Sequence, residues 1–173
     1  LDIEQLSNTA KYGEYSKEMY DMVLDQAWKL AENEMEPANR EGDREGCLWE
    51  DGKVRVPESY HRPYQMYREG GWLPISEDVE AGGQGFPVVM GLAAIEAFGA
   101  ANLALFLYPG LTHGAGRLLE VYGTEEQKRK FMDKLYSAEW CGTMCLTEPQ
   151  AGSDVGAART KAVRNADGSY SIS

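Results

Sequence analysis

The segment Leu146–Asp154 combines backbone and side chains that could bind an anion or the polar edge of a ring. An extended run of residues ends at Thr147, and Pro149 then enforces a bend in the chain. Gly152 and Ser153 follow, and their small size would let backbone N–H groups approach a ligand. A polar loop that closes a β turn explains the same residues equally well. The residues alone leave both interpretations of this segment open.

Other reactive or metal-binding side chains are few and scattered. The chain has three cysteines, Cys47, Cys141 and Cys145, and two histidines, His61 and His113. An odd number of cysteines in a chain of 173 residues does not indicate a disulfide framework. Three cysteines with so few histidines also do not indicate a metal site. We therefore expect reduced thiols, no bound metal ion and a cytoplasmic protein.

Composition argues against some classes of partner. The formal net charge is −11, which opposes binding to nucleic acid or to an anionic membrane surface. The most apolar stretch, Val88–Leu107, is interrupted by Glu96, Gly99 and Asn102. We therefore expect no run that approaches the roughly 18 apolar residues of a membrane span. Residues 1–15 lack the charged and then apolar pattern of a signal peptide.

Two stretches in the first part of the chain have helical spacing. Residues 16–36 place apolar side chains on one face, which predicts a helix that Ser16 caps. Pro37 is predicted to end this helix or to begin the exit from it. Residues 57–69 predict a second helix, in which Pro63 produces a kink or separates the first turn from the rest. Between them, the dipeptide Asp51-Gly52 favours a small hairpin, and a plain loop is the alternative.

Helical patterns continue after a loop over residues 72–87. Residues 88–99 are apolar on most faces, which predicts a central, buried helix. Residues 102–107 either continue this helix or form a short separate one, and residues 110–122 form another. Thr124-Glu-Glu-Gln127 has the pattern of a capping box, so it predicts the start of a further helix.

The pattern changes from helical to extended after Trp140. Residues 141–146 form a short extended run, residues 160–164 alternate between polar and apolar, and residues 170–173 begin another strand after a turn. We therefore predict a mainly α chain, with a helical domain over residues 1–139 and the beginning of a β domain over 140–173.

Three motifs in order along the chain resemble the acyl-CoA dehydrogenase family. Cys145–Ala157 (CLTEPQAGSDVGA) resembles the motif at which the helical domain of these enzymes passes into the β domain. Gly82–Pro87 resembles their glycine-rich loop between helices, and Tyr122–Phe131 with Ser137–Trp140 resembles the run into the flavin-binding strand. The resemblance implies an N-terminal helical bundle followed by the first strands of a β-barrel domain.

The resemblance implies FAD as cofactor and assigns residues to it. Met144, Leu146 and Thr147 would face the isoalloxazine ring, and the Thr147 hydroxyl would hydrogen-bond its pyrimidine edge. Gly152 and Ser153 would lie beside the flavin diphosphate and the pantetheine arm of acyl-CoA, so Ser153 is also a substrate-binding candidate. Ordinary core packing is the alternative for Met144, and a turn hydroxyl is the alternative for Ser153.

The resemblance also implies a reaction and partners. The enzymes remove an α proton from an acyl-CoA thioester and pass the β hydrogen as hydride to the flavin, which gives a trans-2-enoyl-CoA. Electrons would leave to an electron-transfer flavoprotein, and the full-length protein would form homo-oligomers. A related flavin acyl-CoA oxidase or monooxygenase, or a non-catalytic interaction domain, is the alternative.

No catalytic residue is expected in this chain, because the family's base is a carboxylate of a C-terminal helical domain. Glu148 is therefore predicted to be structural, and Asp154 to bind local amides. His113 is predicted to make a satisfied polar contact in a segment that is a candidate wall of the acyl pocket. The isolated 173 residues are expected to be inactive and to bind FAD weakly or not at all.

Two features depart from the common family pattern. Gln150 stands where glycine is frequent, which changes the backbone freedom of the loop. The segment Arg40–Lys53 is longer than in short-chain members, and together with Glu69-Gly-Gly-Trp72 it is similar to the subgroup that includes methylthiopropionyl-CoA dehydrogenase.

Overall fold

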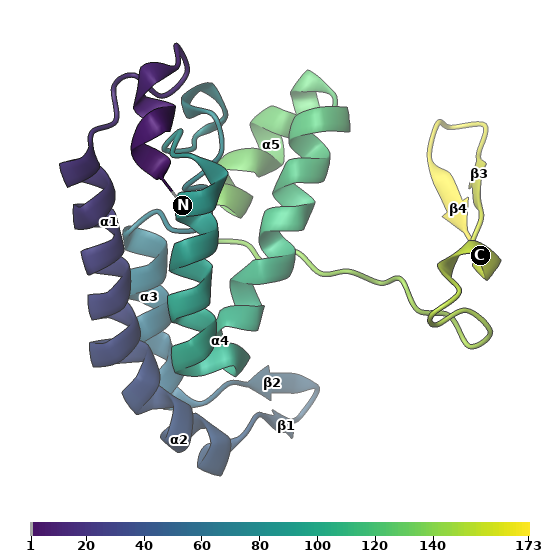
Figure 1. Ribbon diagram of the computed structural model, residues 1–173. Coiled ribbons are helices and arrows are strands. Elements are labelled where there is room, and N and C mark those ends of the chain that lie inside the picture. Colours follow the sequence, from purple (N-terminus) through teal and green to yellow (C-terminus); the bar gives the residue numbers. More distant parts are fainter. Residues whose placement is uncertain (1) are drawn as a thin grey trace. The chain divides into compact units, whose positions relative to one another are not determined.

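The computed structural model describes residues 2–173, which form two compact units that divide after Thr143 (Figure 1). The first unit contains a short 3-10 helix (Ile3–Asn8), five α-helices and the hairpin β1–β2. The second unit, Met144–Ser173, contains the hairpin β3–β4. The chain is therefore mainly α, as predicted, with a helical part followed by a small β part.

The first long helix continues beyond the proline that was predicted to end it. Helix α1 spans Lys17–Leu30, and a π-helical turn over Ala31–Met35 leads directly into α2, Glu36–Glu45. The Ser16 hydroxyl accepts a hydrogen bond from the Met19 amide at 3.3 Å, so the predicted cap is confirmed. The predicted end at Pro37 is wrong, because Pro37 lies in the first turn of α2, where its missing N–H costs nothing.

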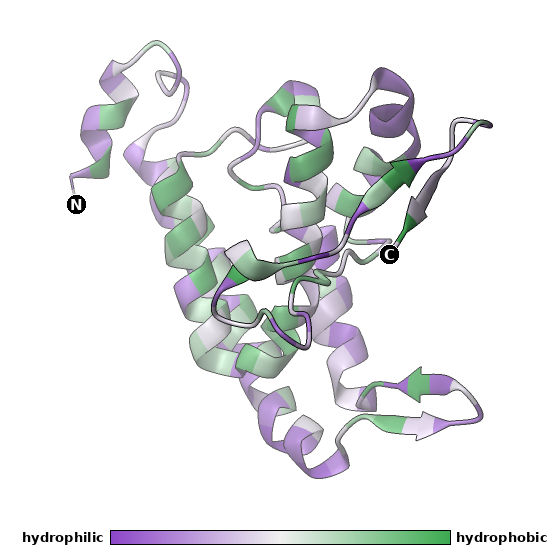
Figure 2. Ribbon diagram, turned by 90° about the vertical axis from the view of Figure 1, so that its right-hand side faces the viewer, coloured by the Kyte–Doolittle hydropathy of each residue, from purple (hydrophilic) through white to green (hydrophobic). Residues whose placement is uncertain are grey.

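The hairpin predicted around Asp51-Gly52 is present. Strands β1, Leu48–Glu50, and β2, Lys53–Arg55, pair in antiparallel fashion, with Trp49 opposite Val54. Asp51 and Gly52 have φ angles of 50° and 77°, as a two-residue primed turn requires. In Figure 2 the mostly hydrophilic α2 lies next to this hairpin of mixed hydropathy.

The second predicted helix is divided at its start, which is the second of the two outcomes predicted for Pro63. A 3-10 turn over Glu58–Tyr60 precedes α3, which spans His61–Glu69. A loop follows in which Val79–Ala81 forms a further 3-10 turn. The loop folds back on itself, because Gly85 N donates to Glu77 O at 2.8 Å. A Cβ atom on Gly83 would lie 2.1 Å from the same carbonyl oxygen, so the close approach depends on glycine.

Helix α4, Val88–Tyr122, joins the separately predicted helices and is broken at one residue. Asn102 has φ −156° and ψ 86°, which are not helical, and the chain turns back there, so that the two halves lie side by side (Figure 1). The rings of Phe98 and Phe106, from either side of the break, have centroids 6.4 Å apart. Residues 103–107 therefore belong to the second half of α4.

The Asn102 side chain connects the break in α4 to the π-helical turn. Its Nδ2 donates to the Met35 carbonyl oxygen at 3.2 Å, and its Oδ1 accepts from the Leu105 amide at 3.0 Å. The residue is fully buried. Asn102 thus caps the second half of α4 and satisfies a carbonyl at the end of the wider turn.

The core of the first unit surrounds the first half of α4. Phe98 is buried between Tyr67 and Trp72, with ring centroids 5.5 and 5.2 Å away in edge-on geometry. Aromatic pairs of this geometry stabilise a core beyond the area that they bury. The other buried members of this cluster come mainly from α1, the π-helical turn and α4: Ala27, Leu30, Ala31, Met35, Ala38, Tyr60, Leu73, Ala94, Ala97, Leu105 and Ala138.

The last helix of the first unit begins with the predicted capping box. Thr124 Oγ1 accepts from the Gln127 amide at 3.2 Å, and Gln127 Oε1 accepts from the Thr124 amide at 2.9 Å. Helix α5 spans Glu125–Tyr136 and packs on α4. Met132 and Leu135 are buried, and Phe131 is partly buried.

Helix α4 meets the length and composition test for a membrane-spanning helix, although the sequence led us to expect no such stretch. Of its most apolar window, 39% is buried inside the unit. The helix is broken at Asn102 and packs on α1, α2 and α5. A helix in the core of a helical unit can have the same composition, and this packing buries part of the apolar surface of α4.

The second unit holds a loop and a short hairpin. Strands β3, Ala162–Arg164, and β4, Tyr170–Ile172, pair in antiparallel fashion around a turn in which Gly168 has φ 86°. A 3-10 turn spans Val155–Ala157. The extended run at 141–147 forms no strand within the described residues, since it has no neighbour there with which to pair.

The Glu148 carboxylate closes the loop of the second unit. It accepts hydrogen bonds from the Arg159 amide at 2.8 Å, the Thr160 amide at 2.9 Å and the Thr160 hydroxyl at 2.6 Å. The Gln150 side chain donates to the same carboxylate. These bonds, first of all the one from the Thr160 side chain, lower the pKa of Glu148 to about 2.

Replacing Asn102 tests its structural role. Asn102→Ala leaves the Met35 carbonyl and the Leu105 amide without their partner, so we expect the free energy of unfolding to fall by about 2–4 kcal/mol. Asn33→Ala, at an exposed position in the π-helical turn, is the control and should change it by less than about 0.5 kcal/mol. Urea denaturation of both variants provides the measurement, and equal stabilities would contradict the role.

Acid should open the loop that Glu148 closes. The pKa of Glu148 is lower in the folded chain than in the unfolded chain. The ionised carboxylate therefore stabilises the loop fully at pH values above 4.5, its ordinary pKa. This stabilisation of the loop is lost as the pH falls through about 2. The amide resonances of Arg159 and Thr160, followed by NMR, should titrate with that low midpoint and should not titrate in Glu148→Gln. A midpoint near 4.5 would disprove the proposed bonds.

Candidate functional site

The five predicted flavin-binding residues lie in the second unit, at the start of its loop. Met144 and Leu146 are 63% and 45% exposed, and Thr147, Gly152 and Ser153 are also exposed. Within residues 2–173, neither the Thr147 nor the Ser153 hydroxyl takes part in a hydrogen bond, so both can bind a ligand. The two apolar side chains pack in no core of this unit and offer a surface for a flat ring.

The loop that carries these residues has a defined shape. Glu148 and Ala151 exchange two backbone hydrogen bonds of 3.0 Å, which makes a tight turn around Pro149 and Gln150. The Gln150 side chain stabilises this turn, because it donates a hydrogen bond to the Glu148 carboxylate. A Cβ atom on Gly152 would meet nothing within 4 Å, so the backbone there faces open space that a ligand could enter.

The two carboxylates of the loop differ from each other. Glu148 is structural, as predicted, because backbone and side-chain donors occupy both of its oxygens. The prediction for Asp154 is wrong, since no amide of the described residues donates to its carboxylate. Instead its backbone carbonyl accepts from the Ala157 amide at 3.1 Å. The turn over 155–157 leaves the Asp154 side chain without a local partner.

A cavity of about 520 Å³ in the first unit lies between the two halves of α4. Its apolar lining comes from the loop after α3 and from both halves of the helix, including Trp72, Leu92, Ile95 and Phe106. Gly110 adds open space, because a Cβ atom there would meet nothing within 4 Å. Ligand cavities of about 300–1,000 Å³ are typical of enzymes, so this one can hold a short alkyl chain.

An ion-pair cluster forms the polar end of this cavity. Glu77 is 9% exposed, and its Oε1 lies 2.6 Å from His113 Nε2 while its Oε2 accepts from Arg117 Nη1 at 3.1 Å. Arg117 also donates to Glu120, which in turn accepts from the Tyr136 hydroxyl. His113 thus makes a satisfied polar contact, as predicted. Glu77 was not predicted from the sequence, although the spacing of positions 113, 117 and 120 places three polar side chains on one helix face.

Hydrogen bonds within the cluster shift the pKa values of Glu120 and Tyr136. Burial favours the neutral acid of Glu120, but hydrogen bonds from Tyr136 and Arg117 outweigh it, and the pKa of Glu120 lies below its ordinary value. Burial and the same hydrogen bond raise the pKa of Tyr136. Within residues 2–173, no three His, Cys, Asp or Glu side chains gather in a geometry that could bind a metal ion.

Comparison with known proteins agrees with this structure. The family model for the acyl-CoA dehydrogenase N-terminal domain matches residues 17–139. The chain is 38% identical over 169 residues to 3-methylmercaptopropionyl-CoA dehydrogenase of Ruegeria pomeroyi, which covers 98% of the chain and 29% of the relative. It is 39% identical over 168 residues to the broad-specificity linear acyl-CoA dehydrogenase FadE5 of Mycobacterium tuberculosis, which covers 93% of the chain and 27% of the relative.

A solved structure shows the same fold. The acyl-CoA dehydrogenase of Bacillus anthracis, crystallised in complex with FAD, superimposes with a TM-score of 0.70 at 26% identity. The match covers 92% of this chain and 26% of that one. The chain thus spans less than a third of the length of each of these three proteins. Because the family model matches most of its residues, and both relatives align over nearly all of it, the chain belongs to the acyl-CoA dehydrogenase family.

Proposed function

We propose that this chain contributes part of the FAD site and one wall of the acyl pocket to an enzyme that converts an acyl-CoA thioester into a trans-2-enoyl-CoA. The observation that carries this proposal is the exposed loop of the second unit, in which the Thr147 and Ser153 hydroxyls lack partners among the described residues. FAD, when bound, would accept the β hydrogen as hydride. Family membership and the FAD named for the Bacillus anthracis relative support the assignment.

The residues of the loop fit the parts of a flavin nucleotide. The Thr147 hydroxyl can donate to the polar edge of the ring, and the exposed side chains of Met144 and Leu146 can cover an apolar face. The open backbone at Gly152 and the Ser153 hydroxyl can donate to phosphate oxygens or to the pantetheine amide. The bonds around Glu148 hold this loop in shape before a ligand arrives, which reduces the entropy lost on binding.

The cavity between the halves of α4 is our candidate for the wall of the acyl pocket. Phe106 and Gly110 lie in its lining, one helical turn apart. The Phe106 ring offers an aromatic surface, and Gly110, which has no side chain, leaves space for an acyl chain. The Glu77 cluster at the polar end of the cavity ties the loop after α3 to the second half of α4. It therefore keeps the two sides of the cavity at a fixed separation.

The proton chemistry is assigned to residues outside this chain. A general base must be able to take up a proton near neutral pH, and Glu148, with a pKa of about 2, cannot do so. We further propose that the full-length protein is a cytoplasmic homo-oligomer that passes its electrons to an electron-transfer flavoprotein. Rapid reduction of molecular oxygen by the full-length enzyme would favour an acyl-CoA oxidase or a monooxygenase instead.

Removing one hydroxyl tests the flavin site. In the full-length protein, Thr147→Val should weaken FAD binding by roughly five- to tenfold, since one hydrogen bond contributes about 1 kcal/mol. Thr143→Val changes the same atoms at an exposed position on the other side of the unit boundary and should keep the affinity of the parent. Flavin fluorescence during titration of the apoprotein measures both. Equal affinities would remove Thr147 from the site.

A second substitution tests the assignment of Glu148. In the full-length enzyme, Glu148→Gln should lower kcat by less than about tenfold, because it loosens the loop and removes no base. Loss of a true general base would cost roughly 10²- to 10⁴-fold. Single-turnover reduction of the bound flavin by an acyl-CoA distinguishes these results, and a loss of the larger size would identify Glu148 as the base.

A further inference from the structure

Residues 3–15, which we call the strap, lie against the start of α1 and the loop after α3, at the end of the first unit opposite the β1–β2 hairpin (Figure 1). The strap contains the 3-10 helix Ile3–Asn8 and a run of turns, and none of its residues is buried. Ile3 and Tyr15 pack on a small apolar cluster, which is formed by Tyr20, Ile75, Phe86 and Met90. The strap therefore covers this cluster from outside.

Few bonds hold the strap in place. Within residues 2–173, two hydrogen bonds join it to the chain beyond α1: the Tyr15 hydroxyl donates to the Gln84 carbonyl oxygen at 2.7 Å, and Lys11 Nζ donates to Asp78 Oδ1 at 3.0 Å. Both side chains of the Lys11–Asp78 pair are more than half exposed, so this pair contributes little to stability. The Tyr15 ring also stacks on Tyr20, with ring centroids 6.3 Å apart. A segment with so few bonds and no buried residue opens more readily than the core of the unit.

A buried hydroxyl in the cluster under the strap has no partner. Tyr20 is 1% exposed, and among the buried side-chain nitrogen and oxygen atoms of residues 2–173 its hydroxyl is the one that makes no hydrogen bond. Burial of a hydroxyl without a partner costs free energy, because the group loses its hydrogen bonds with water. The Tyr20 hydroxyl would regain these bonds if Ile3 and Tyr15 moved off the cluster. It therefore destabilises the closed strap relative to an open one.

The strap also forms part of the wall of the cavity between the halves of α4. Lys11 and Tyr12 belong to the lining of that cavity, and the Lys11–Asp78 pair joins the strap to the loop that carries Glu77 at its polar end. The remaining lining residues come from α3, the loop after it and α4. Movement of the strap would therefore remove one side of the cavity and leave its other walls in place.

We propose that the strap opens and closes over the cavity between the halves of α4, and that the unpartnered Tyr20 hydroxyl lowers the free energy of its opening. The bond from Tyr15 to Gln84 holds the strap closed, and the buried hydroxyl of Tyr20 acts against it. The balance between these two stacked tyrosines determines how often the strap is open. As a gate for an acyl chain the strap rests on the function proposed above, but its opening and closing do not.

The same substitution at the two stacked tyrosines tests the strap, because it should have opposite effects. In the full-length protein, Tyr15→Phe removes the bond to Gln84 and should speed amide exchange of residues 3–15 roughly fivefold. Tyr20→Phe removes a hydroxyl that has no partner and should slow the same exchange roughly fivefold. Hydrogen exchange followed by mass spectrometry measures both. Exchange that is not slowed in Tyr20→Phe, or not accelerated in Tyr15→Phe, would overturn the proposal.

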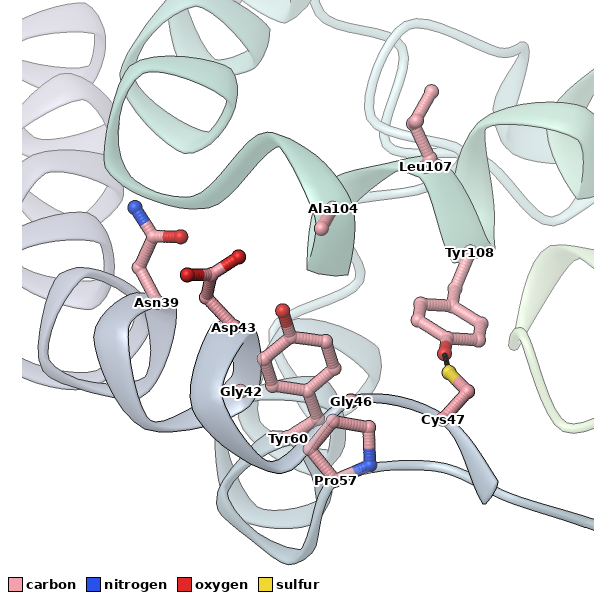
Figure 3. Close-up of a pocket in the computed structure, with 10 residues that line it drawn as sticks. All are labelled: Asn39, Gly42, Asp43, Gly46, Cys47, Pro57, Tyr60, Ala104, Leu107 and Tyr108. Carbon is pink, nitrogen blue, oxygen red and sulfur yellow. Dashed lines mark hydrogen bonds between the residues drawn. The ribbon is translucent and has the colours of Figure 1, made fainter. Parts of the chain in front are cut away.

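Two controls show whether the effect is confined to the strap. Tyr170→Phe removes the hydroxyl of an exposed ring in β4 and should leave the exchange of the strap unchanged. The cavity drawn in Figure 3 lies at the base of the β1–β2 hairpin, and residues 39–47 supply part of its lining. These residues should exchange equally in the parent and in the Tyr15 and Tyr20 variants. A change there as large as in the strap would show an altered stability of the whole unit and would overturn the proposal.

Binding of hexanoyl-CoA separates the strap from the function proposed above. Stopped-flow records of flavin absorbance should show faster binding to Tyr15→Phe and slower binding to Tyr20→Phe, by factors similar to those of the exchange rates. Changed exchange rates with unchanged binding rates would overturn the role of the strap at this cavity. If the parent protein neither binds nor oxidises an acyl-CoA, the function proposed above fails. Opposite exchange effects of the two variants would still support the opening of the strap.

Discussion

The two hydrogen bonds of Asn102 determine how the first unit is arranged. A straight helix of 35 residues would carry the ends of α4 far apart, but the break brings its halves together. A break exposes backbone groups, and in a core these need partners. The Asn102 side chain accepts a hydrogen bond from the Leu105 amide and donates one to the Met35 carbonyl oxygen. The same side chain therefore provides hydrogen-bond partners both at the break in α4 and at the π-helical turn after α1. The cavity between the halves of α4 exists because of this reversal.

Local chemistry in the sequence predicted most of the elements. The Ser16 cap, the Asp51-Gly52 turn and the capping box at Thr124 each involve residues within a few positions of one another, and all three are present. The features that were missed join distant residues. The continuation of the helix through Pro37 involves a π-helical turn whose end is satisfied by Asn102, 67 residues further along the chain. Spacing patterns carry no information about such a partner.

In the candidate site, too, the features formed by neighbouring residues were predicted, and those that join distant residues were not. The loop from Thr147 to Ser153 was visible in the sequence because a proline and small residues follow one another, and the family resemblance gave it a cofactor. The Glu77 cluster was not visible, because its carboxylate belongs to a loop whereas its partners, His113 and Arg117, belong to a helix. A carboxylate next to the expected flavin-binding residues suggests a catalytic base. The bonds of Glu148 show instead how a charged group can serve as the rigid centre of a loop.

The position of the break within the chain has a consequence for biosynthesis. A ribosome makes Met35 and the whole of α1 well before it makes Asn102. The partner that accepts the Asn102 amide is therefore already present when the apolar first half of α4 leaves the exit tunnel. The most hydrophobic segment of the chain can fold onto surfaces that precede it, and it need not wait for any later residue before it begins to bury its side chains.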